Sequence, residues 1–140
     1  MKPKIAFSAI ALALAVAGGP AAAEPLPKFA GGLLVDAQGM TLYTFDKDTR
    51  GRSNCNGGCA AAWPPAPAAE DAGASGDFTV IARDDGARQW AYKGSPVYRF
   101  AADARAGDVN GDNRNGVWHA VRSGSAPQGR AGSSSMGYAY

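Results

Sequence analysis

The feature that most constrains this chain is an internal repeat with an offset of 55 residues. When the sequence is shifted by that amount, glycine, aromatic, acidic and basic residues coincide without a gap. The coinciding pairs are Gly39 and Gly94, Leu42 and Val97, Tyr43 and Tyr98, Phe45 and Phe100, Asp48 and Asp103, Arg50 and Arg105, and Trp63 and Trp118. We interpret them as two copies of one unit, about residues 30–68 and 78–122. Units of roughly forty residues rarely bury enough surface alone, so we expect both to fold together as one β domain over residues 30–122.

Residue patterns within the units predict short antiparallel strands. The predicted strands are Leu33–Val35, Met40–Phe45, Phe78–Arg83, Arg88–Lys93, Val97–Ala101 and Val117–Arg122. A glycine-bearing loop separates the first two, and an Asp-Gly turn signal separates the next two. One helical turn is expected after Cys59, because two prolines then stop it. The predicted fold class is all-β: a small compact antiparallel domain of two related β units, with Gly/Pro-rich loops.

Both ends of the chain are predicted to lie outside this domain. Residues 1–23 resemble a secretory signal peptide, with a basic start, an apolar run and small residues that suit cleavage between Ala23 and Glu24. The apolar run is shorter than the roughly 20 residues that span a bilayer, and no cysteine near the cleavage site could carry a lipid. Residues 24–29 are predicted to be an N-terminal extension, and the Gly/Ser-rich residues 123–140 a disordered tail. We therefore expect a periplasmic or secreted protein with no membrane span and no lipid anchor.

Charge and motifs exclude several classes of function. The formal charge of +2 equals the two lysines of the signal, Lys2 and Lys4, so the rest of the chain is neutral. A neutral domain is not expected to bind nucleic acid. The sequence also has no nucleophile elbow, zinc-protease motif, phosphate loop or dinucleotide-binding glycine pattern. We therefore expect no enzyme activity and no catalytic residues.

The only cysteines, Cys55 and Cys59, are separated by Asn-Gly-Gly. An even cysteine count in an exported protein favours a disulfide, and the two glycines allow the tight turn that it needs. Two other interpretations stay open: a redox-active pair, and a thiolate metal site. Thioredoxin-type redox pairs have two intervening residues, whereas this pair has three.

The repeated motif carries a family resemblance. Tyr43 to Asp48 and Tyr98 to Asp103 both fit the pattern Tyr-x-(Phe/Trp/Tyr)-x-x-Asp. Together with Cys55 to Cys59 before Trp-Pro-Pro, Tyr-Lys-Gly at 92–94 and Val-Trp-His at 117–119, these motifs resemble the bacterial secreted repeats of unknown function, also described as predicted lipoproteins. The resemblance covers nearly all of residues 30–122 and implies architecture and location. Many family members carry a lipid-bearing cysteine after the signal, which this chain lacks.

The motif residues have two interpretations. In the structural one, the aromatic residues form the core and each aspartate accepts backbone N–H bonds in the turn that follows its strand. In the functional one, Asp48 and Asp103 are paired ligands at the interface between the repeats. The residues concerned are Tyr43, Phe45, Asp48, Trp63, Tyr98, Phe100, Asp103 and Trp118.

Two weak metal-site candidates remain. Asp108, Asn110 and Asp112 have the alternating oxygens that begin a calcium loop, but Asn113 stands where glycine is wanted and His119 where glutamate is wanted. His119 is the only histidine, and we expect it to be a packed residue. With Cys55, Cys59 and Met40 or Met136 it could instead form a soft copper site, since thiolate, imidazole and thioether suit Cu(I).

The sequence thus predicts an exported, non-catalytic binding or interaction protein of the cell envelope, with no firm cofactor and an unknown partner or small ligand. The alternative is a periplasmic copper-handling or thiol-redox protein that uses Cys55, Cys59 and His119.

Overall fold

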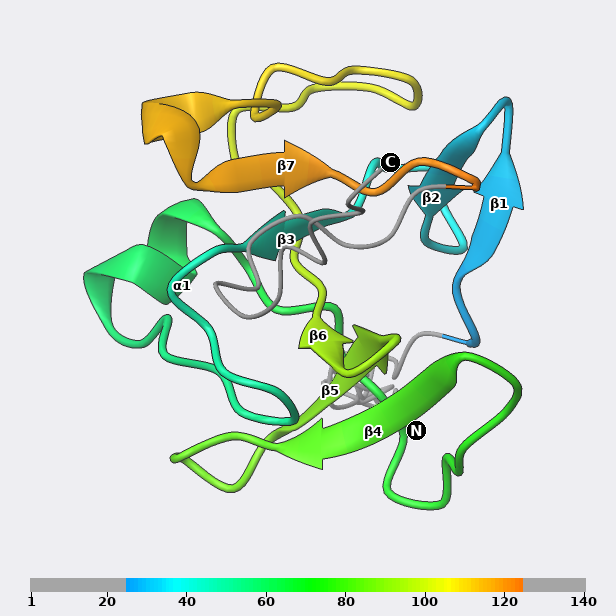
Figure 1. Cartoon of the computed structure of the whole chain (residues 1–140), viewed down its shortest axis with the longest axis vertical. Helices are drawn as coiled ribbons and strands as arrows, with labels where there is room; N and C mark the ends of the chain where they lie inside the picture. The colour runs from blue at the N-terminus through cyan, green and yellow to red at the C-terminus, as the bar shows by residue number, and fades with distance from the viewer. Residues whose placement is uncertain (1–24, 125–140) are drawn as a thin grey trace, which may run out of the picture.

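Glycines and prolines recur every few residues in this chain, and the strands between them are short. The computed structural model describes residues 25–124. Its elements, in order, are β1 (Lys28–Ala30), β2 (Leu33–Val35), β3 (Tyr43–Phe45), α1 (Gly58–Ala62), β4 (Phe78–Ala82), β5 (Arg88–Tyr92), β6 (Ser95–Pro96), the 3-10 turn η1 (Arg114–Gly116) and β7 (Trp118–Ala120). All strand pairs are antiparallel, so the predicted all-β fold is confirmed (Figure 1).

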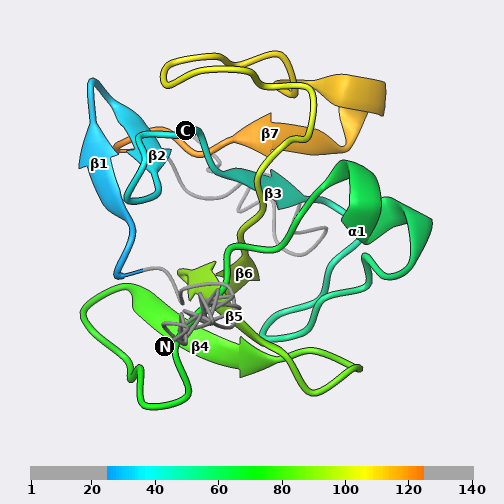
Figure 2. The same cartoon turned by 180° about the vertical axis from the view of Figure 1, so that it is seen from behind.

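Three small sheets make up the domain: β1–β2, β3–β7 and β4–β5–β6. Both views place the β1–β2 hairpin and α1 at opposite ends of the β3–β7 pair, with the three-stranded sheet below (Figures 1 and 2). The β3–β7 pair joins the first repeat to the second, with Tyr43 opposite Ala120 and Phe45 opposite Trp118. The two units therefore share one sheet, which is why neither is a separate domain.

The predicted strand Leu33–Val35 is present as β2, but β1, which precedes it, was not predicted. Lys28 and Phe29 belong to β1 although they lie in the segment predicted to be an N-terminal extension. Gly31 and Gly32 both have positive φ, at 58° and 81°, as a two-residue hairpin turn of type I′ requires. All three residues of β1 are exposed, so the strand has no buried face and no alternation from which it could be predicted.

The β4–β5 hairpin forms where it was predicted. The N–H of Gly86 donates to the carbonyl of Arg83, and Gly86 has a φ of 84°. This is a type I turn followed by a glycine in the left-handed region, a common three-residue hairpin loop. The prediction of a strand over 97–101 is wrong: β6 covers Ser95–Pro96, just before that segment, and within the segment Tyr98 makes only single bridges to Tyr43 and Pro65. The neighbouring segment contains prolines at 64, 65 and 67, which lack the N–H that a longer ladder needs.

Two hydrophobic clusters form the core. One contains Leu34, Leu42, Ala66, Ala68, Trp90, Tyr92, Val97 and Val121. The other contains Tyr43, Cys55, Trp63, Tyr98, Trp118 and Ala120. The second cluster draws on both repeats and contains Tyr43, Trp63, Tyr98 and Trp118 of the motif, with Phe45 and Phe100 packed against it.

The predicted helical turn after Cys59 is present as α1, which ends at Ala62, just before Trp63. Among residues 25–124, no helix is long and apolar enough to cross a membrane. The predicted signal peptide, and residues 125–140 of the predicted tail, lie outside the described residues.

Candidate functional site

The two motif copies exchange their hydrogen bonds. The hydroxyl of Tyr43 donates to Asp103 Oδ2 at 2.6 Å, and the hydroxyl of Tyr98 donates to Asp48 Oδ2 at 2.6 Å. The backbones of the two tyrosines are paired as well, with N–H to carbonyl distances of 2.8 and 2.9 Å. Each tyrosine is thus bound to the aspartate of the other repeat. The motif is therefore a reciprocal lock between the repeats.

Each aspartate uses its second oxygen to fix the loop that follows its own motif. Asp48 Oδ1 accepts the N–H of Asn54 at 2.7 Å, and Asp103 Oδ1 accepts the N–H of Asn110 at 3.0 Å. The structure thus shows the structural role predicted for these carboxylates, which accept backbone N–H bonds in the following loop, and adds that each is bonded to the tyrosine of the other repeat. We name the two arrangements the Tyr98 centre (Tyr98 with Asp48) and the Tyr43 centre (Tyr43 with Asp103).

Four aromatic rings of the motif form a continuous stack between the centres. The order is Phe45, Trp118, Trp63, Phe100, with ring-centroid distances of 4.2, 3.8 and 4.2 Å. Tyr43 meets Trp63 edge-on, and Tyr98 meets Trp118 edge-on, at 5.5 and 5.3 Å. The two tryptophans come from different repeats and stack on each other, so the arrangement has the approximate twofold symmetry that the sequence repeat implies. Offset and edge-on ring pairs each add about 0.5–1.5 kcal/mol beyond burial.

Burial shapes the electrostatics of both centres. Tyr43 and Tyr98 are completely buried, and this burial, followed by the neighbouring carboxylate, raises the pKa of each hydroxyl. Burial also raises the pKa of Asp48, although the Asn54 N–H, the Tyr98 hydroxyl and the charge of Arg83 act against it. Both tyrosines are therefore neutral donors at physiological pH.

The Tyr98 centre extends into a buried polar network that the sequence did not predict. Because the single O–H of Tyr98 is donated to Asp48, the Ser53 hydroxyl donates to Tyr98 at 2.6 Å. Arg83, only 7% exposed, donates to Ser53 Oγ at 2.9 Å and to Gln89 Oε1 at 2.7 Å. The same guanidinium donates to the carbonyl of Cys55 at 2.5 Å. The acceptors of these hydrogen bonds are all neutral, and the charge of the guanidinium also acts on the nearby Asp48.

The disulfide belongs to this network. Cys55 and Cys59 are joined, as predicted, and the ring that they close presents two acceptors to Arg83, the Cys55 carbonyl and Asn56 Oδ1. In this structure neither sulfur is a thiolate, the form in which cysteine binds copper. The disulfide thus positions the buried guanidinium of the Tyr98 centre.

The Tyr43 centre has no such network. The N–H of Gly111 approaches the Tyr43 hydroxyl at 3.3 Å, and a Cβ at Gly111 would lie only 2.7 Å from the Trp63 ring and 3.0 Å from Tyr43. Only glycine fits there without displacing the stack. The two loops also differ just after the residue whose N–H binds the aspartate. Asn54 is followed by Cys55 in the Tyr98 centre, and Asn110 is followed by Gly111 in the Tyr43 centre.

The candidate calcium residues are used by the protein itself. Asp108 Oδ2 accepts the N–H groups of Ala104 and Arg105. Asp112 accepts the Ala120 N–H at 2.9 Å and pairs with Arg122 at 2.7 Å; although burial acts in the other direction, these two bonds lower the pKa of Asp112. Asn110 supplies the backbone N–H to Asp103. Within the described part of the chain, no three His, Cys, Asp or Glu side chains lie together in a geometry suited to a metal ion.

His119 pairs with an acidic residue of the neighbouring strand segment. Its Nε2 lies 2.9 Å from Asp46 Oδ2, and the two side chains are 19% and 25% exposed. His119 lies opposite Thr44 in the β3–β7 register, on the face away from Trp118. Its role as a packed, hydrogen-bonded residue is the one that the sequence favoured.

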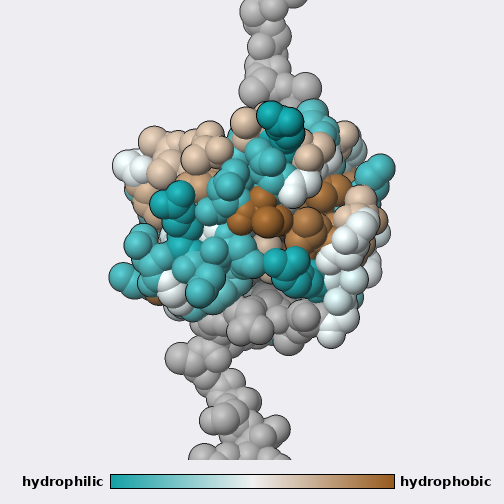
Figure 3. Space-filling model, turned by 90° about the horizontal axis from the view of Figure 1, so that it is seen from above, coloured by the Kyte–Doolittle hydropathy of each residue, from teal (hydrophilic) through white to brown (hydrophobic). Residues whose placement is uncertain are grey.

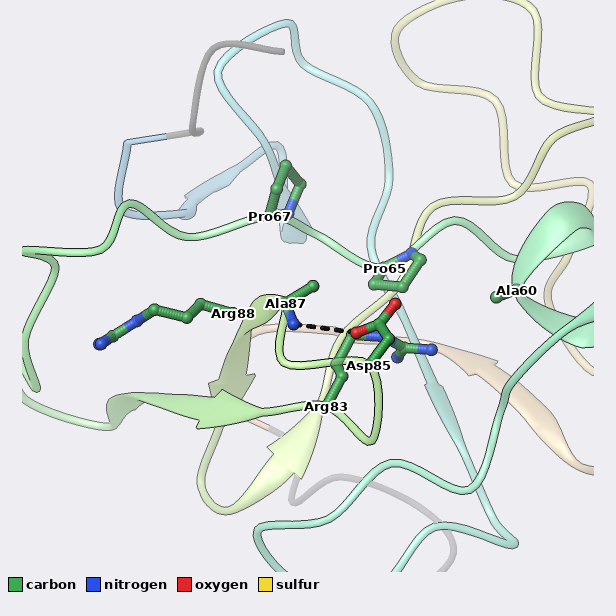
Figure 4. Close-up of a pocket in the computed structure, with 7 residues that line it drawn as sticks. All are labelled: Ala60, Pro65, Pro67, Arg83, Asp85, Ala87 and Arg88. Carbon is green, nitrogen blue, oxygen red and sulfur yellow. Dashed lines mark hydrogen bonds between the residues drawn. The ribbon is translucent and has the colours of Figure 1, made fainter. Parts of the chain in front are cut away.

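Two pockets open where residues of the two repeats meet. The first, which we name the hairpin pocket, has a volume of about 260 Å³ and is lined by Ala60, Pro65, Pro67, Arg83, Asp85, Ala87 and Arg88. Figure 4 shows the β4–β5 turn on one side of it and the prolines on the other, with the bond from the Ala87 N–H to Asp85. The second, the basic pocket, has a volume of about 300 Å³ and is lined by Arg50, Gly51, Gly76, Asp77, Thr79, Lys93 and Gly94.

None of the predicted motif residues lines either pocket. Most of the pocket residues come from turns and loops, which show no periodicity in the sequence, and the others are Ala60 of α1, Thr79 of β4 and Arg88 of β5. One sequence signal for the basic pocket was the Lys-Gly pair at 93–94. A two-residue hairpin loop normally has Asn or Gly at its first position, so a lysine there is unusual.

Comparison with known proteins identifies one family. A family model described as a secreted repeat of unknown function matches the chain twice, over residues 29–67 and 79–122. No curated protein and no solved structure gives a significant match.

Proposed function

This chain belongs to the family of secreted repeats of unknown function, and we propose that it acts as an exported, non-catalytic binding or interaction protein of the bacterial cell envelope. The observation that carries the proposal is the use of the motif. Its tyrosines are fully buried and its carboxylates are bonded across the repeat interface. Tyrosines buried in this way cannot contact a molecule in solution, and the carboxylates already bind the protein itself, so recognition falls to other residues at the surface.

The surface offers suitable features for binding. The hairpin pocket and the basic pocket each contain charged side chains and are held by both repeats. Turn hydrogen bonds fix parts of both linings, from Ala87 to Asp85 in the hairpin pocket and from Gly51 to Gly94 in the basic pocket, and rigid walls reduce the entropy lost on binding. Pockets of this size suit a small molecule or part of one.

An apolar patch supports the interaction part of the proposal. Seen from above, hydrophobic side chains gather at and to the right of the middle of the face, with hydrophilic ones on the left and below and residues of intermediate hydropathy on the right (Figure 3). Patches of this kind mark contact sites on soluble proteins.

Native mass spectrometry of protein from the exported fraction tests this function. We expect a mature chain that begins near Glu24, lacks two hydrogens because of the disulfide, and retains a small molecule or a partner protein. Asp85→Asn alters the hairpin pocket, and Asp84→Asn on the same turn is its control, because Asp84 does not line the pocket. Protein that retains nothing and cross-links to nothing in intact cells contradicts a binding role, and chemical turnover of a bound molecule contradicts a non-catalytic one.

A further inference from the structure

The basic pocket has the chemistry of an anion site. Two cationic residues line it, Arg50 from the first repeat and Lys93 from the β5–β6 turn, together with Thr79 of β4. Asp77 is the single acidic residue in the lining, so the lining has a net positive charge. This composition favours a ligand with at least one negative charge.

The arginine is held in place without a charged partner. A Cβ at Gly94 would lie 3.0 Å from Arg50 Cγ and 3.2 Å from its Cζ, so the side chain of Arg50 rests flat on the backbone of Gly94. The N–H of Gly51 donates to the carbonyl of Gly94 at 2.9 Å and fixes the two segments together. Within residues 25–124, Arg50 makes no ion pair. Its guanidinium is therefore positioned and still has its donors available.

The lysine occupies an unfavourable backbone conformation. Lys93 has a φ of 48° in the two-residue turn that it forms with Gly94, where asparagine or glycine is preferred. Its N–H donates to the carbonyl of Asp77 at 2.7 Å, and its ammonium lies 5.4 Å from the Tyr92 ring centroid. No carboxylate within the described residues pairs with it. A residue kept against its backbone preference at the edge of a pocket points to a role for its side chain.

We propose that the basic pocket binds the phosphate group of a small ligand through Arg50 and Lys93. Arginine binds phosphate through two parallel N–H bonds, and lysine binds it as a point charge. The Thr79 hydroxyl supplies a further donor. The volume of about 300 Å³ leaves room for more than the phosphate itself. This inference rests on the proposed binding function and gives it a ligand class.

The second repeat supplies an internal control. Arg105 occupies the position of Arg50 in the repeat, but there Gln38 stands at the position of Lys93 and Ala106 at that of Gly51. A Cβ at Gly39 would lie 3.1 Å from the Ala106 methyl group, whereas a Cβ at the equivalent Gly94 would meet the Arg50 side chain. The corresponding place therefore has one cation fewer, and Arg105 does not line either pocket.

Phosphate titration of the mature chain at constant ionic strength, followed by backbone amide chemical shifts, tests the proposal. We expect saturable shifts centred on Gly51, Gly76, Lys93 and Gly94. Arg50→Gln, which keeps the aliphatic stem over Gly94, and Lys93→Asn, which suits the left-handed turn, should each weaken binding about tenfold, as expected for losing a charge-assisted bond worth about 1.4 kcal/mol. Arg105→Gln should leave the affinity unchanged.

A second arm distinguishes a free ligand from a lipid headgroup. Vesicles of phosphatidylglycerol are compared with vesicles of phosphatidylcholine alone, with the same three variants. The site is supported if Arg50→Gln and Lys93→Asn lose binding to inorganic phosphate or to phosphatidylglycerol vesicles while Arg105→Gln keeps it. Loss of phosphate binding indicates a free ligand, and loss of vesicle binding indicates a lipid headgroup. Equal behaviour of all three variants, or shifts spread over the whole surface, overturns it. If a different molecule is retained in the native mass spectrum while phosphate fails to bind, this inference fails and the binding function stands.

Discussion

The Tyr98 centre and the Tyr43 centre contain the same lock in different surroundings. In both, a buried tyrosine donates to an aspartate of the other repeat at 2.6 Å. Around Tyr98 the lock continues through Ser53 to Arg83 and the disulfide ring, whereas around Tyr43 it ends at the backbone of Gly111. The comparison shows that the motif specifies how the repeats join, while the loop after each motif determines what else is built there.

The largest expected effect concerns the part that the centres share. Trp63→Ala and Trp118→Ala each remove one of the two central rings of the stack, and each should cost about 3–5 kcal/mol in the free energy of unfolding. Because the ring contacts of the two tryptophans mirror each other, we expect the two losses to agree within about 1 kcal/mol. Urea denaturation measures both. A much smaller loss of unfolding free energy in one of the two variants would show that the two tryptophans contribute unequally to stability, despite the approximate symmetry of the stack.

The next effect separates the centres. Tyr98→Phe removes the donor to Asp48 and the acceptor of Ser53, and Tyr43→Phe removes the donor to Asp103 and a long contact from Gly111. A hydrogen bond to a charged group contributes about 1.5–3 kcal/mol, and we expect Tyr98→Phe to be the more destabilising of the two in urea denaturation. Tyr92→Phe is the control, since the Tyr92 hydroxyl makes no hydrogen bond within the described residues. A larger loss in Tyr43→Phe contradicts the importance of the network.

The disulfide should affect one centre only. Removing it in a Cys55→Ala/Cys59→Ala variant should lower the free energy of unfolding by about 2 kcal/mol, because the closed loop is short. In a double-mutant cycle the effect of Tyr98→Phe should change in this background, and the effect of Tyr43→Phe should not. If the disulfide instead couples to Tyr43→Phe and not to Tyr98→Phe, the disulfide does not act through the Arg83 network and the prediction is wrong.

The smallest effect is a pH dependence that belongs to Asp48. Burial raises the pKa of this carboxyl above its ordinary value of 3.8, so the folded chain binds the proton more tightly than the unfolded chain. Stability contributed by Asp48 therefore increases as the pH falls from neutral through the folded pKa towards 3.8, and is lost as the pH rises. Asp48→Asn removes this titration, so its stability relative to the original chain should be higher at pH 7 than at pH 4. Denaturation curves at both pH values test this, and an unchanged difference contradicts it.

Much of the fold was open to prediction from local patterns. The β4–β5 hairpin was predictable because the Asp84-Asp85-Gly86 turn and the flanking strands agree. The strand at 28–30 was not, because it is exposed on every residue. The strand predicted at 97–101 does not form beyond single bridges at Tyr98, because the segment beside it is rich in proline and pairing partners are not visible in a local pattern.

The candidate site was less predictable than the fold. The motif residues were found because they repeat, and their reciprocal pairing is a consequence of two copies meeting across one axis. Ser53, Arg83 and Gln89 carry no signal of burial, since polar residues in strands and loops usually face water. The basic pocket joins residues up to 44 positions apart, from 50 to 94, and only the folded chain brings them together.

Three properties can be read from the residues alone: the protein consists of two copies of one β unit, the copies fold together, and the cysteines can close a short ring. These follow from periodicity, turn chemistry and unit size, which are local or additive properties of the chain. The tertiary structure decided which tyrosine binds which aspartate, that the disulfide ring holds a buried arginine, and which cations remain available at the surface. These depend on distances between residues far apart in the chain, which burial and hydrogen bonding fix only when both repeats are in contact.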